Sequence, residues 1–414
     1  MAQTTLKEIF SDYKKQAAHI FKNKELLTER FLPSTIIHRN EQINQLGMIV
    51  APSIKNEKIS NTFIFGTVGT GKTLTVRHVM SELEKEADKV KILYVNCKMK
   101  RISDTEYRMV AELCRGLGKE VPVTGLPTDR VYGMFFEFLE ERNQHVILVL
   151  DEIDNLVKKI GDDVLYSLLR NEMVNTKLSI IGISNDTSFT ETLDPRVKSS
   201  LSEEEIIFPP YNAMQLQDIL LMRADMAFNP GVLEKGVVAK AAALAAQEHG
   251  DARKALDLLR VAGEMAERSG SGKIGITYVD SAERKLDTDR TTEIVRSQPK
   301  QSLAVLASII KLKEQGQEDI QTGDVFSFYE KLASRRGLKT LTQRRVQDLI
   351  NELDMLGIIN TRVVSKGRYG RTREIRILLD NQVMGKIRKI LEENYFLDSL
   401  GRFGGNTRPA GSGV

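Results

Sequence analysis

The sequence predicts an α/β fold, in which a parallel sheet with helices on both faces is followed by a small all-helical domain and a C-terminal winged helix. Three observations support this prediction. In the first half of the chain, short apolar runs alternate with helix-like segments, which is typical of a parallel sheet covered on both faces. A glycine-rich loop joins one of these runs to a helix-like segment. The last part of the chain has the order helix, helix, helix, hairpin, which is typical of a winged helix-turn-helix.

The composition indicates a globular protein of several domains. The chain has 414 residues, and a prior of about 150 residues per domain leads us to expect three domains. Apolar residues make up 41% and charged residues 28%, and no run of apolar residues is long enough for a transmembrane helix. The first ten residues lack the apolar core of a signal peptide. Cys97 and Cys114 have neither zinc-site spacing nor the number needed for a disulfide framework, which favours a reducing, cytoplasmic setting.

The first domain is predicted to cover residues 1–208. Pro209 and Pro210 end its alternating pattern, because two successive prolines can continue neither a helix nor a central strand. The expected strands are the apolar runs at residues 62–65, 91–95, 145–150 and 178–183.

The loop after the first apolar run has the pattern of a phosphate-binding loop, or P-loop. Its glycines allow backbone angles that a Cβ would block, so that successive N–H groups face phosphate oxygens at a helix N-terminus. Lys72 adds a positive charge, and the Thr73 hydroxyl can bind Mg²⁺. A flexible glycine loop is the alternative, but the flanking strand and helix favour a nucleoside-triphosphate site. The nucleotide-binding candidates here are Gly66, Thr67, Val68, Gly69, Thr70, Gly71, Lys72, Thr73 and Leu74.

Two carboxylates follow the third apolar run, at the expected carboxyl edge of the sheet, where ligands of open α/β sheets bind. Asp151 is expected to hold Mg²⁺ together with Thr73, usually through water, because this ion dehydrates reluctantly. Glu152 is expected to orient or deprotonate the attacking water. Asp154 is expected at the surface or in a supporting position. A solvated acidic turn is the alternative for this segment.

Three further polar residues are candidates for the same site. Asn185 ends the next apolar run, where its amide can bond the γ-phosphate or the attacking water; an ordinary turn residue is the alternative. Arg253 starts a helix of the second domain and could reach the γ-phosphate, although alone it would be a solvated helix residue. Arg223 of the same domain is a nucleotide-binding candidate. The predicted catalytic set is Glu152, Asp151, Lys72, Asn185 and Arg253.

The remaining chain is predicted to form two mainly helical domains. Residues 209–290 contain an alanine-rich run and no strong strand, so an all-helical domain is expected there. A polar linker is expected near residues 287–300. It leads into a winged-helix domain that is expected at residues 295–400 and overlaps its first residues. Its expected helices cover residues 301–314, 322–333 and 342–356, and its expected strands cover residues 358–364 and 372–378.

Charge is concentrated in the winged helix. The whole chain has a net charge of only +4, yet residues 331–376 contain twelve basic and four acidic side chains. A localised basic face usually indicates a polyanionic partner, here duplex DNA, with one helix in the major groove and the hairpin tip in the minor groove. A winged helix that binds a protein is the alternative. The DNA-binding candidates are Gln343, Arg344, Arg345, Gln347, Lys366, Arg368, Tyr369, Arg371 and Arg373.

The combination of motifs resembles an AAA+ ATPase. Four stretches narrow the resemblance to the archaeal origin-recognition initiator family, which is related to the eukaryotic origin-recognition and helicase-loading ATPases. The resemblance covers nearly the whole chain, apart from the N-terminal arm and the tail after about Leu400. The four stretches are residues 123–129, 193–201, 208–211 and 250–253.

This resemblance implies that ATP lies between the α/β base and a helical lid, and that slow, Mg²⁺-dependent ATP hydrolysis acts as a switch. It implies that the winged helix and an insertion near residues 100–126 both grip double-stranded origin DNA. The implied partners are the replicative helicase and other initiator paralogues on the DNA. A nucleoid-associated cytoplasmic protein with no membrane partner is expected.

Residues 31–41 resemble the family segment that lies against the adenine, which makes Ile36, Ile37 and Arg39 candidates there. Tyr211 could pack near the nucleotide, and a buried core tyrosine is the equal alternative. Related ATPases complete a neighbour's site with an arginine where this chain has Ser200. Arg196 would serve instead, or activation by a neighbour would be absent.

The resulting hypothesis is an ATP-bound replication initiator. Two alternatives stay open at this point: a clamp- or helicase-loader ATPase without sequence-specific DNA binding, and an ATP-gated transcription regulator with a winged helix.

Overall fold

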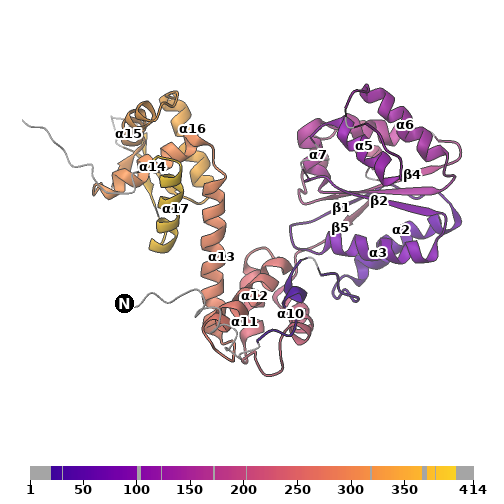
Figure 1. Cartoon of the computed structure of the whole chain (residues 1–414), viewed down its shortest axis with the longest axis horizontal. Coiled ribbons are helices and arrows are strands. Elements are labelled where there is room, and N and C mark those ends of the chain that lie inside the picture. Colours follow the sequence, from indigo (N-terminus) through magenta and orange to yellow (C-terminus); the bar gives the residue numbers. More distant parts are fainter. Residues whose placement is uncertain are drawn as a thin grey trace, which may run out of the picture. The chain divides into compact units, whose positions relative to one another are not determined.

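The computed structural model of the chain describes residues 20–29, 31–99, 104–122, 124–170, 173–201, 203–317, 319–365, 371–377 and 379–397. The chain divides into two compact units, Met1–Ala282 and Glu283–Val414, which we describe separately (Figure 1). None of the helices in the described part of the chain has the length and apolar content that a membrane crossing requires.

The first unit contains a five-stranded parallel sheet, as the sequence predicts for its fold class. The strand order is β2-β3-β4-β1-β5, and every neighbouring pair is parallel. The four expected strands are present within one or two residues of their predicted ends. The bounds are β1 Thr62–Phe65, β2 Val90–Asn96, β3 His145–Asp151, β4 Lys177–Ser184 and β5 Glu204–Ile207.

The fifth strand was not predicted. It has only four residues, of which the first two are exposed glutamates, so it lacks the apolar run that marks the other strands. It lies at the edge of the sheet, where Thr62 pairs with Glu204. The free edge of β5 is contacted by helix α2 (Asn40–Val50), where Gln45 Nε2 donates to the Glu205 carbonyl at 3.4 Å.

Helices cover both faces of the sheet (Figure 1). One apolar core packs α2 and α3 against one face, and a second core packs five helices against the other face. Phe135 and Met109 are fully buried in the second core. The bounds are α2 Asn40–Val50, α3 Lys72–Glu86, α5 Glu106–Gly116, α6 Thr128–Glu140, α7 Ile153–Ile160, α8 Asp163–Arg170 and α9 Pro195–Leu201, with short 3-10 turns at Lys24–Leu27, Ala51–Lys55 and Phe189–Thr192.

The lid is all helical, as predicted, and the first described residues of the chain, from Ile20 on, pack against it. Phe21 stacks on Phe228 with ring centroids 5.0 Å apart, and Lys22 N donates to the Ala227 carbonyl at 2.8 Å. Lys24 pairs with Glu264 at 2.7 Å. The expected base of residues 1–208 therefore includes an N-terminal segment that packs on the lid instead. The lid helices are α10 Ala213–Ala227, α11 Val237–Gln247 and α12 Ala252–Arg268.

The expected polar linker near residues 287–300 is wrong. Most of it belongs to one long helix, α13, Ile276–Arg296. Only a few side chains of α13, such as Val279 and Val295, are buried. The helix therefore needs no apolar run in its sequence. A helix that is mostly solvated has a sequence similar to that of a linker.

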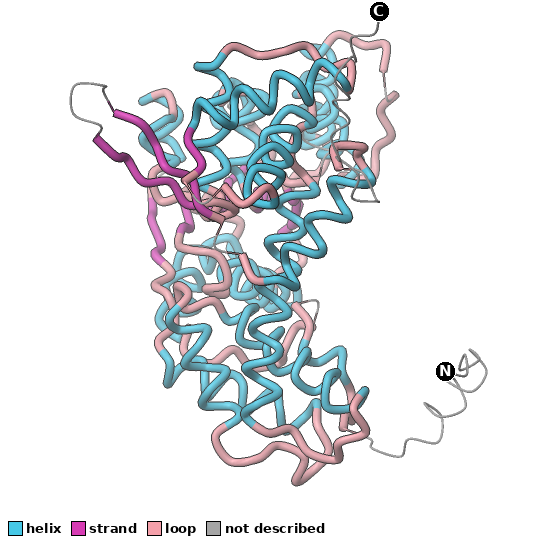
Figure 2. The backbone as a smooth tube through the Cα atoms, turned by 90° about the vertical axis from the view of Figure 1, so that its left-hand side faces the viewer, coloured by secondary structure: helices cyan, strands magenta, loops and turns pink. Residues whose placement is uncertain are grey.

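The second unit has the predicted winged-helix order with two additions. The two-residue strand β6 pairs with β8, and a final helix follows the hairpin. Asp380 caps this final helix by accepting from Gln382 N and Val383 N. Figure 2 shows the strands of the hairpin. The bounds are α14 Lys300–Glu314, β6 Ile320–Gln321, α15 Thr322–Arg335, α16 Gln343–Met355, β7 Asn360–Ser365, β8 Arg371–Arg376 and α17 Asn381–Glu393.

Candidate nucleotide site and nucleic-acid interface

The glycine-rich loop lies between β1 and α3, as the motif requires. Gly69 has φ +75° and Gly71, the N-cap of α3, has φ +87°, a region that favours glycine. Lys72 is 5% exposed, and its Nζ donates to the carbonyl oxygens of Gly66 and Thr67, both at 2.8 Å. The lysine therefore lies folded over the loop that it is expected to serve.

Burial controls the charge of Lys72. Its pKa is lowered to about 8, mainly because the ammonium loses water and also because Arg253 lies nearby; Asp151 partly opposes this shift. Lys72 in the free protein is therefore mostly charged at neutral pH and loses its proton gradually as the pH rises through about 8.

We expect nucleotide affinity to fall as pH rises above about 8. A bound phosphate favours the charged lysine, so binding to the neutral form must take up a proton, which costs up to about tenfold in affinity per pH unit. Equilibrium titrations from about pH 7.5 to 9.5 measure this, because phosphate groups with a pKa of about 6 are already ionised over that range. Lys72→Arg is the control, since arginine stays charged. A flat profile for the wild type would contradict the assignment.

The end of β3 brings a carboxylate to the loop. Asp151 is 3% exposed, and Thr73 Oγ1 lies 3.1 Å from its Oδ2 and 3.3 Å from its Oδ1. The Tyr94 hydroxyl also donates to Oδ2. One hydroxyl and one carboxylate at the head of α3 are a donor set that suits Mg²⁺, which binds few protein ligands and keeps several waters.

Glu152 follows at a strained position. It has φ +56° and forms the N-cap of α7, a conformation that non-glycine residues seldom adopt and that often marks functional sites. Its carboxylate accepts from Asn155 Nδ2 at 3.0 Å and pairs with Lys98 at 3.7 Å. Asn185, at the end of β4, lines the same cavity.

Asp154 differs from one expectation. It is buried rather than at the surface, with 6% exposure, and it accepts from Ser184 Oγ at 2.9 Å. Asp154 thus links α7 to β4 behind the cavity.

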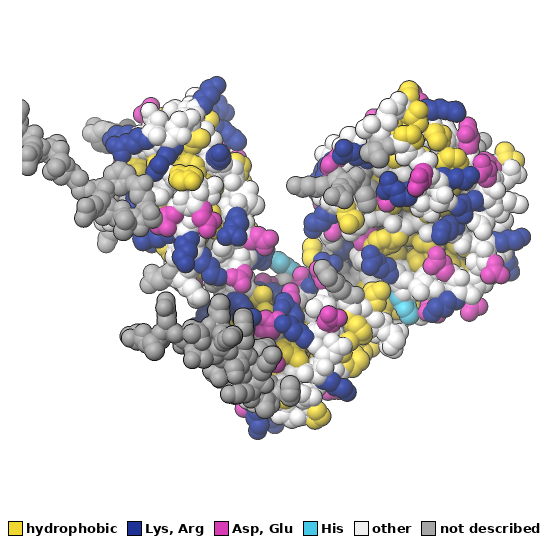
Figure 3. Space-filling model, in the orientation of Figure 1, with side chains coloured by type: hydrophobic (Ala, Val, Ile, Leu, Met, Phe, Trp, Pro, Cys, Tyr) yellow, Lys and Arg dark blue, Asp and Glu magenta, His cyan; other side chains and the backbone are white. Residues whose placement is uncertain are grey.

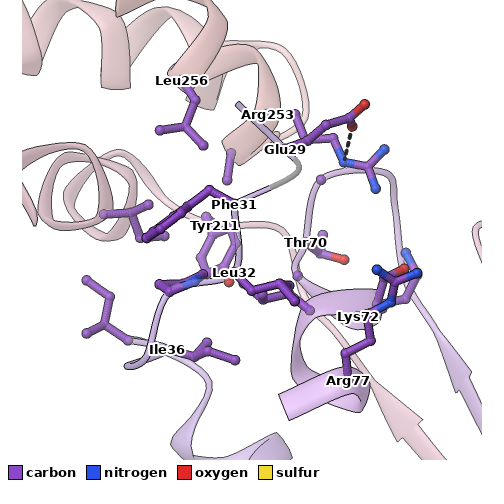
Figure 4. A pocket seen from close by; sticks show the side chains of 18 of the residues that line it. Glu29, Phe31, Leu32, Ile36, Thr70, Lys72, Arg77, Tyr211, Arg253 and Leu256 are labelled. Carbon is purple, nitrogen blue, oxygen red and sulfur yellow. Dashed lines mark ion pairs between the residues drawn. The ribbon is translucent and has the colours of Figure 1, made fainter. Parts of the chain in front are cut away.

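The lid contributes the opposite wall of the cavity (Figure 4). Ala252 N donates to the Gly69 carbonyl at 3.2 Å, which ties the start of α12 to the phosphate loop. Asp251 caps α12 by accepting from Arg253 N and Lys254 N. The Arg253 side chain faces the cavity, where it pairs with Glu29 of the N-terminal segment at 3.5 Å.

The other end of the cavity is apolar and aromatic. The Arg223 guanidinium lies 4.5 Å from the Phe31 ring centroid, and burial lowers its pKa to about 10. Its Nη1 is buried and has no hydrogen-bond partner among the described residues, so it has a donor to offer a ligand. Ile36, Ile37 and Tyr211 line this part of the cavity, which would suit a nucleobase.

Most of the predicted nucleotide-site residues line this one cavity. Arg39 does not: it is 2% exposed and lies behind the loop, where it donates to the carbonyls of Thr70 at 2.9 Å and Pro209 at 2.6 Å. Its guanidinium lies 3.8 Å from the Tyr211 ring centroid. Arg39 therefore supports the phosphate loop from behind and does not line the part of the cavity where an adenine was expected. The predicted residues that line the cavity are Ile36, Ile37, Gly69, Thr70, Gly71, Lys72, Thr73, Leu74, Asp151, Glu152, Asn185, Tyr211, Arg223 and Arg253; Gly66, Thr67 and Val68 do not.

The sequence did not indicate several residues that line the cavity, among them Glu29, Arg77 and Leu256, whereas Phe31 begins the segment expected against the adenine. The position of Glu29 follows from the packing of the N-terminal segment on the lid, which has no local signal. Arg77 lies one helical turn after Thr73, a spacing that could have marked it.

Arg196 lies outside the cavity. It pairs with Asp194 at 3.0 Å and lies 4.9 Å from the Tyr166 ring centroid, and its side chain is 61% exposed. It is therefore free to face a second molecule.

The predicted DNA-binding residues of α16 are exposed, but they differ in their partners. Gln343, Arg344 and Gln347 lie on its solvent face. Arg345 pairs with Asp348 at 3.7 Å and Glu352 at 3.5 Å on the same helix. Arg373 is half-buried on β8, and Figure 3 shows lysine and arginine side chains over the winged-helix unit, interspersed with acidic ones. Lys366, Arg368 and Tyr369 lie outside the described residues, and Arg371 is described only as part of β8.

The parallel sheet, phosphate loop, helical lid and winged helix define an AAA+ ATPase with a DNA-binding type of C-terminal domain. Family models agree: an AAA domain matches residues 57–186, a Cdc6 AAA+ ATPase-type lid domain matches residues 217–284, and the CDC6 C-terminal winged helix domain matches residues 293–386.

Comparisons with known proteins identify the family. An ORC1-type DNA replication protein of Pyrococcus abyssi is 51% identical over 93% of both chains, and one of Methanosarcina acetivorans is 50% identical over 92% of both. The structure of the Aeropyrum pernix ORC1 protein in complex with DNA matches with a TM-score of 0.79 and 43% identity, over 91% of this chain and 98% of that one. The chain belongs to the family of ORC1-type DNA replication proteins, which confirms the resemblance found in its sequence.

Proposed function

We propose that this protein is an ATP-dependent initiator of DNA replication, which binds double-stranded origin DNA and helps to recruit the replicative helicase. One observation carries the proposal: a cavity bounded by phosphate loop, acidic strand end and lid arginine occurs in the same chain as a winged helix with exposed polar and basic residues on α16. The names of its relatives and the DNA complex of the Aeropyrum pernix protein support it.

In the proposed ATPase cycle, N–H groups of the phosphate loop and Lys72 hold the β- and γ-phosphates. Thr73 and Asp151 would hold Mg²⁺, which would neutralise charge on the phosphates. Glu152 accepts a proton from the attacking water or orients it, and Asn185 bonds that water or the γ-phosphate. Arg253 carries the state of the γ-phosphate to the lid through α12.

The contacts of two of these groups support slow turnover. Glu152 is engaged by Lys98 and Asn155, and Arg253 by Glu29. Arg253 would have to leave Glu29 to reach the γ-phosphate, whereas Glu152 can keep Asn155 and has to exchange only Lys98 for the attacking water. An exposed Arg196 offers a way for another initiator molecule on the DNA to assist, and hydrolysis would then act as a switch rather than as a motor.

On the DNA, α16 would lie in the major groove with Gln343, Arg344 and Gln347 toward bases or phosphates. The hairpin would face the minor groove, and the segment near residues 100–126 would add a second contact from the base. Most contacts would reach phosphates, so affinity would fall with salt.

We expect Arg344→Ala to weaken duplex binding by about 1 to 3 kcal/mol. Arg345→Ala is the matched control, with the same change in size and charge one residue along. It should cost less, because two carboxylates of α16 already engage Arg345. Fluorescence anisotropy with a labelled origin duplex measures both. Equal losses would show that the two ion pairs do not withhold Arg345 from the DNA, and would contradict the distinction drawn between these arginines.

The proposal is tested by comparing origin with random duplex at physiological salt. An initiator binds the origin more tightly, whereas equal affinity would favour a clamp- or helicase-loader ATPase. Genome-wide binding sites at replication start sites, rather than at promoters, separate the initiator from a transcription regulator. Co-purification of the helicase with DNA-bound protein tests the recruiting role. A protein with this role would be cytoplasmic and associated with the nucleoid.

A further inference from the structure

Next to the nucleotide site lies a half-buried tyrosine, Tyr94, to which the proposed mechanism gives no part. We propose that Tyr94 is a positioning residue that leaves Asp151 only one oxygen for the metal, so that the site selects Mg²⁺ over Ca²⁺. This inference rests on the proposed Mg²⁺-dependent binding of ATP.

Sheet register brings Tyr94 to Asp151. Tyr94 lies on β2 opposite Val149 of β3, two residues before the carboxylate. Its neighbours Leu93 and Val95 point into one core, whereas Tyr94 packs on the other face of the sheet, beneath α3. From there its hydroxyl donates to Asp151 Oδ2.

The two oxygens of Asp151 are therefore not equivalent. Oδ2 accepts from Tyr94 and lies 3.1 Å from Thr73 Oγ1, whereas Oδ1 has, among the described residues, only the longer Thr73 contact at 3.3 Å. Asp151 and Thr73 line the cavity and Tyr94 does not. Tyr94 would therefore affect a bound metal ion only indirectly, by orienting the carboxylate of Asp151.

Arg77 holds the tyrosine from the cavity side. Its guanidinium lies 4.4 Å from the Tyr94 ring centroid, and it is on α3 one turn after Thr73. A cation over the ring restricts its tilt, which keeps the hydroxyl directed at Oδ2. Arg77, Tyr94, Asp151 and Thr73 form a closed arrangement of three elements: α3, β2 and β3.

Mg²⁺ and Ca²⁺ differ in how many oxygens of a carboxylate they coordinate. Mg²⁺ requires near-octahedral geometry and keeps several waters, so a single oxygen that accepts from a metal-bound water satisfies it. Ca²⁺ is larger, takes more oxygen ligands and often binds both oxygens of one carboxylate. An Asp151 whose Oδ2 is occupied by Tyr94 suits the first ion and not the second.

Tyr94→Phe tests this inference, because it removes the hydroxyl and keeps the ring under Arg77. The affinity for a fluorescent ATP analogue is measured with EDTA, with Mg²⁺ and with Ca²⁺. We expect unchanged affinity in EDTA and a loss of about tenfold in the gain that Mg²⁺ provides, the low end of what supporting residues of metal ligands contribute. The gain from Ca²⁺ should stay the same or rise.

Tyr132→Phe is the matched control, since Tyr132 OH donates to Glu106 at 2.7 Å in the same unit, away from the cavity. Its three affinities should equal those of the wild type. Arg77→Gln should shift the Mg²⁺ to Ca²⁺ ratio in the same direction as Tyr94→Phe. This second variant tests the inference without changing the tyrosine itself.

Three outcomes would overturn the inference: an unchanged Mg²⁺ gain, equal losses with both ions, or a loss that already appears in EDTA. The last would mean that the tyrosine only stabilises the fold. Failure of the proposed function has a different result, because wild-type protein would then show no metal-dependent gain in ATP affinity.

Discussion

The Glu152→Gln protein is expected to bind ATP as tightly as the wild type and to hydrolyse it at least about 100-fold more slowly, since a positioned general base contributes roughly 10²- to 10⁴-fold. Glutamine matches the glutamate in shape and can still accept from Asn155, so the turn into α7 should be kept. It cannot accept a proton from water. Single-turnover hydrolysis of labelled ATP, compared with equilibrium binding of the same nucleotide, measures the two effects separately.

Glu141→Gln is the control for this experiment. Glu141 pairs with Lys119 on the surface, so its amide should change neither binding nor hydrolysis. Normal turnover by the Glu152→Gln protein would refute the assigned role and would direct attention to Asp154. Loss of ATP binding would show instead that the carboxylate supports the site structurally.

The parts of the nucleotide site that the sequence predicts are those encoded within short segments. The phosphate loop is one such segment, because glycines, a lysine and a threonine at fixed spacing between a strand and a helix have few other uses. Asp151 and Glu152 are another, because parallel strands place their carboxyl ends at one edge. These local patterns also predicted the fold class and four of the five strands of the parallel sheet.

Contacts between distant parts of the chain were not predictable in this way. Arg39 was expected at an adenine, yet it bonds the carbonyl of Pro209, which lies 170 residues away in the sequence. Glu29 lines the cavity and comes from an N-terminal segment that packs on the lid, where Phe21 stacks on Phe228. Both contacts depend on tertiary packing, which no local sequence pattern indicates.

Exposed charge was also difficult to interpret from sequence. Arg344 and Arg345 are adjacent and chemically identical, but helical geometry places Arg345 three and seven residues from two carboxylates of α16. The polar residues near 287–300 likewise indicated a linker, where most of the chain forms the helix α13. A count of charges predicts a basic surface but does not show which arginines and lysines already pair with carboxylates.

Lys72→Ala is expected to abolish tight ATP binding. The ammonium would donate to β- and γ-phosphate oxygens, and two charge-assisted hydrogen bonds are worth about 3 to 6 kcal/mol, which corresponds to a loss of roughly a hundredfold or more in affinity. Isothermal titration with ATP and with ADP measures this loss. The loss should be larger for ATP, because only ATP presents the γ-phosphate to the lysine.

The thermal stability of the Lys72→Ala protein shows whether this loss is specific. The folded-state pKa of Lys72, about 8, is below the ordinary value of 10.5, so at neutral pH the buried charge opposes folding and is present in both states. Removing it should leave the melting temperature unchanged or raised. Lys98→Ala, at a lysine whose side chain is 73% exposed beside Glu152, is the matched control and should keep ATP affinity. A Lys72→Ala protein that retains tight binding would contradict the phosphate role, whereas a lowered melting temperature would assign Lys72 to the structure of the loop, where its Nζ already bonds two carbonyls.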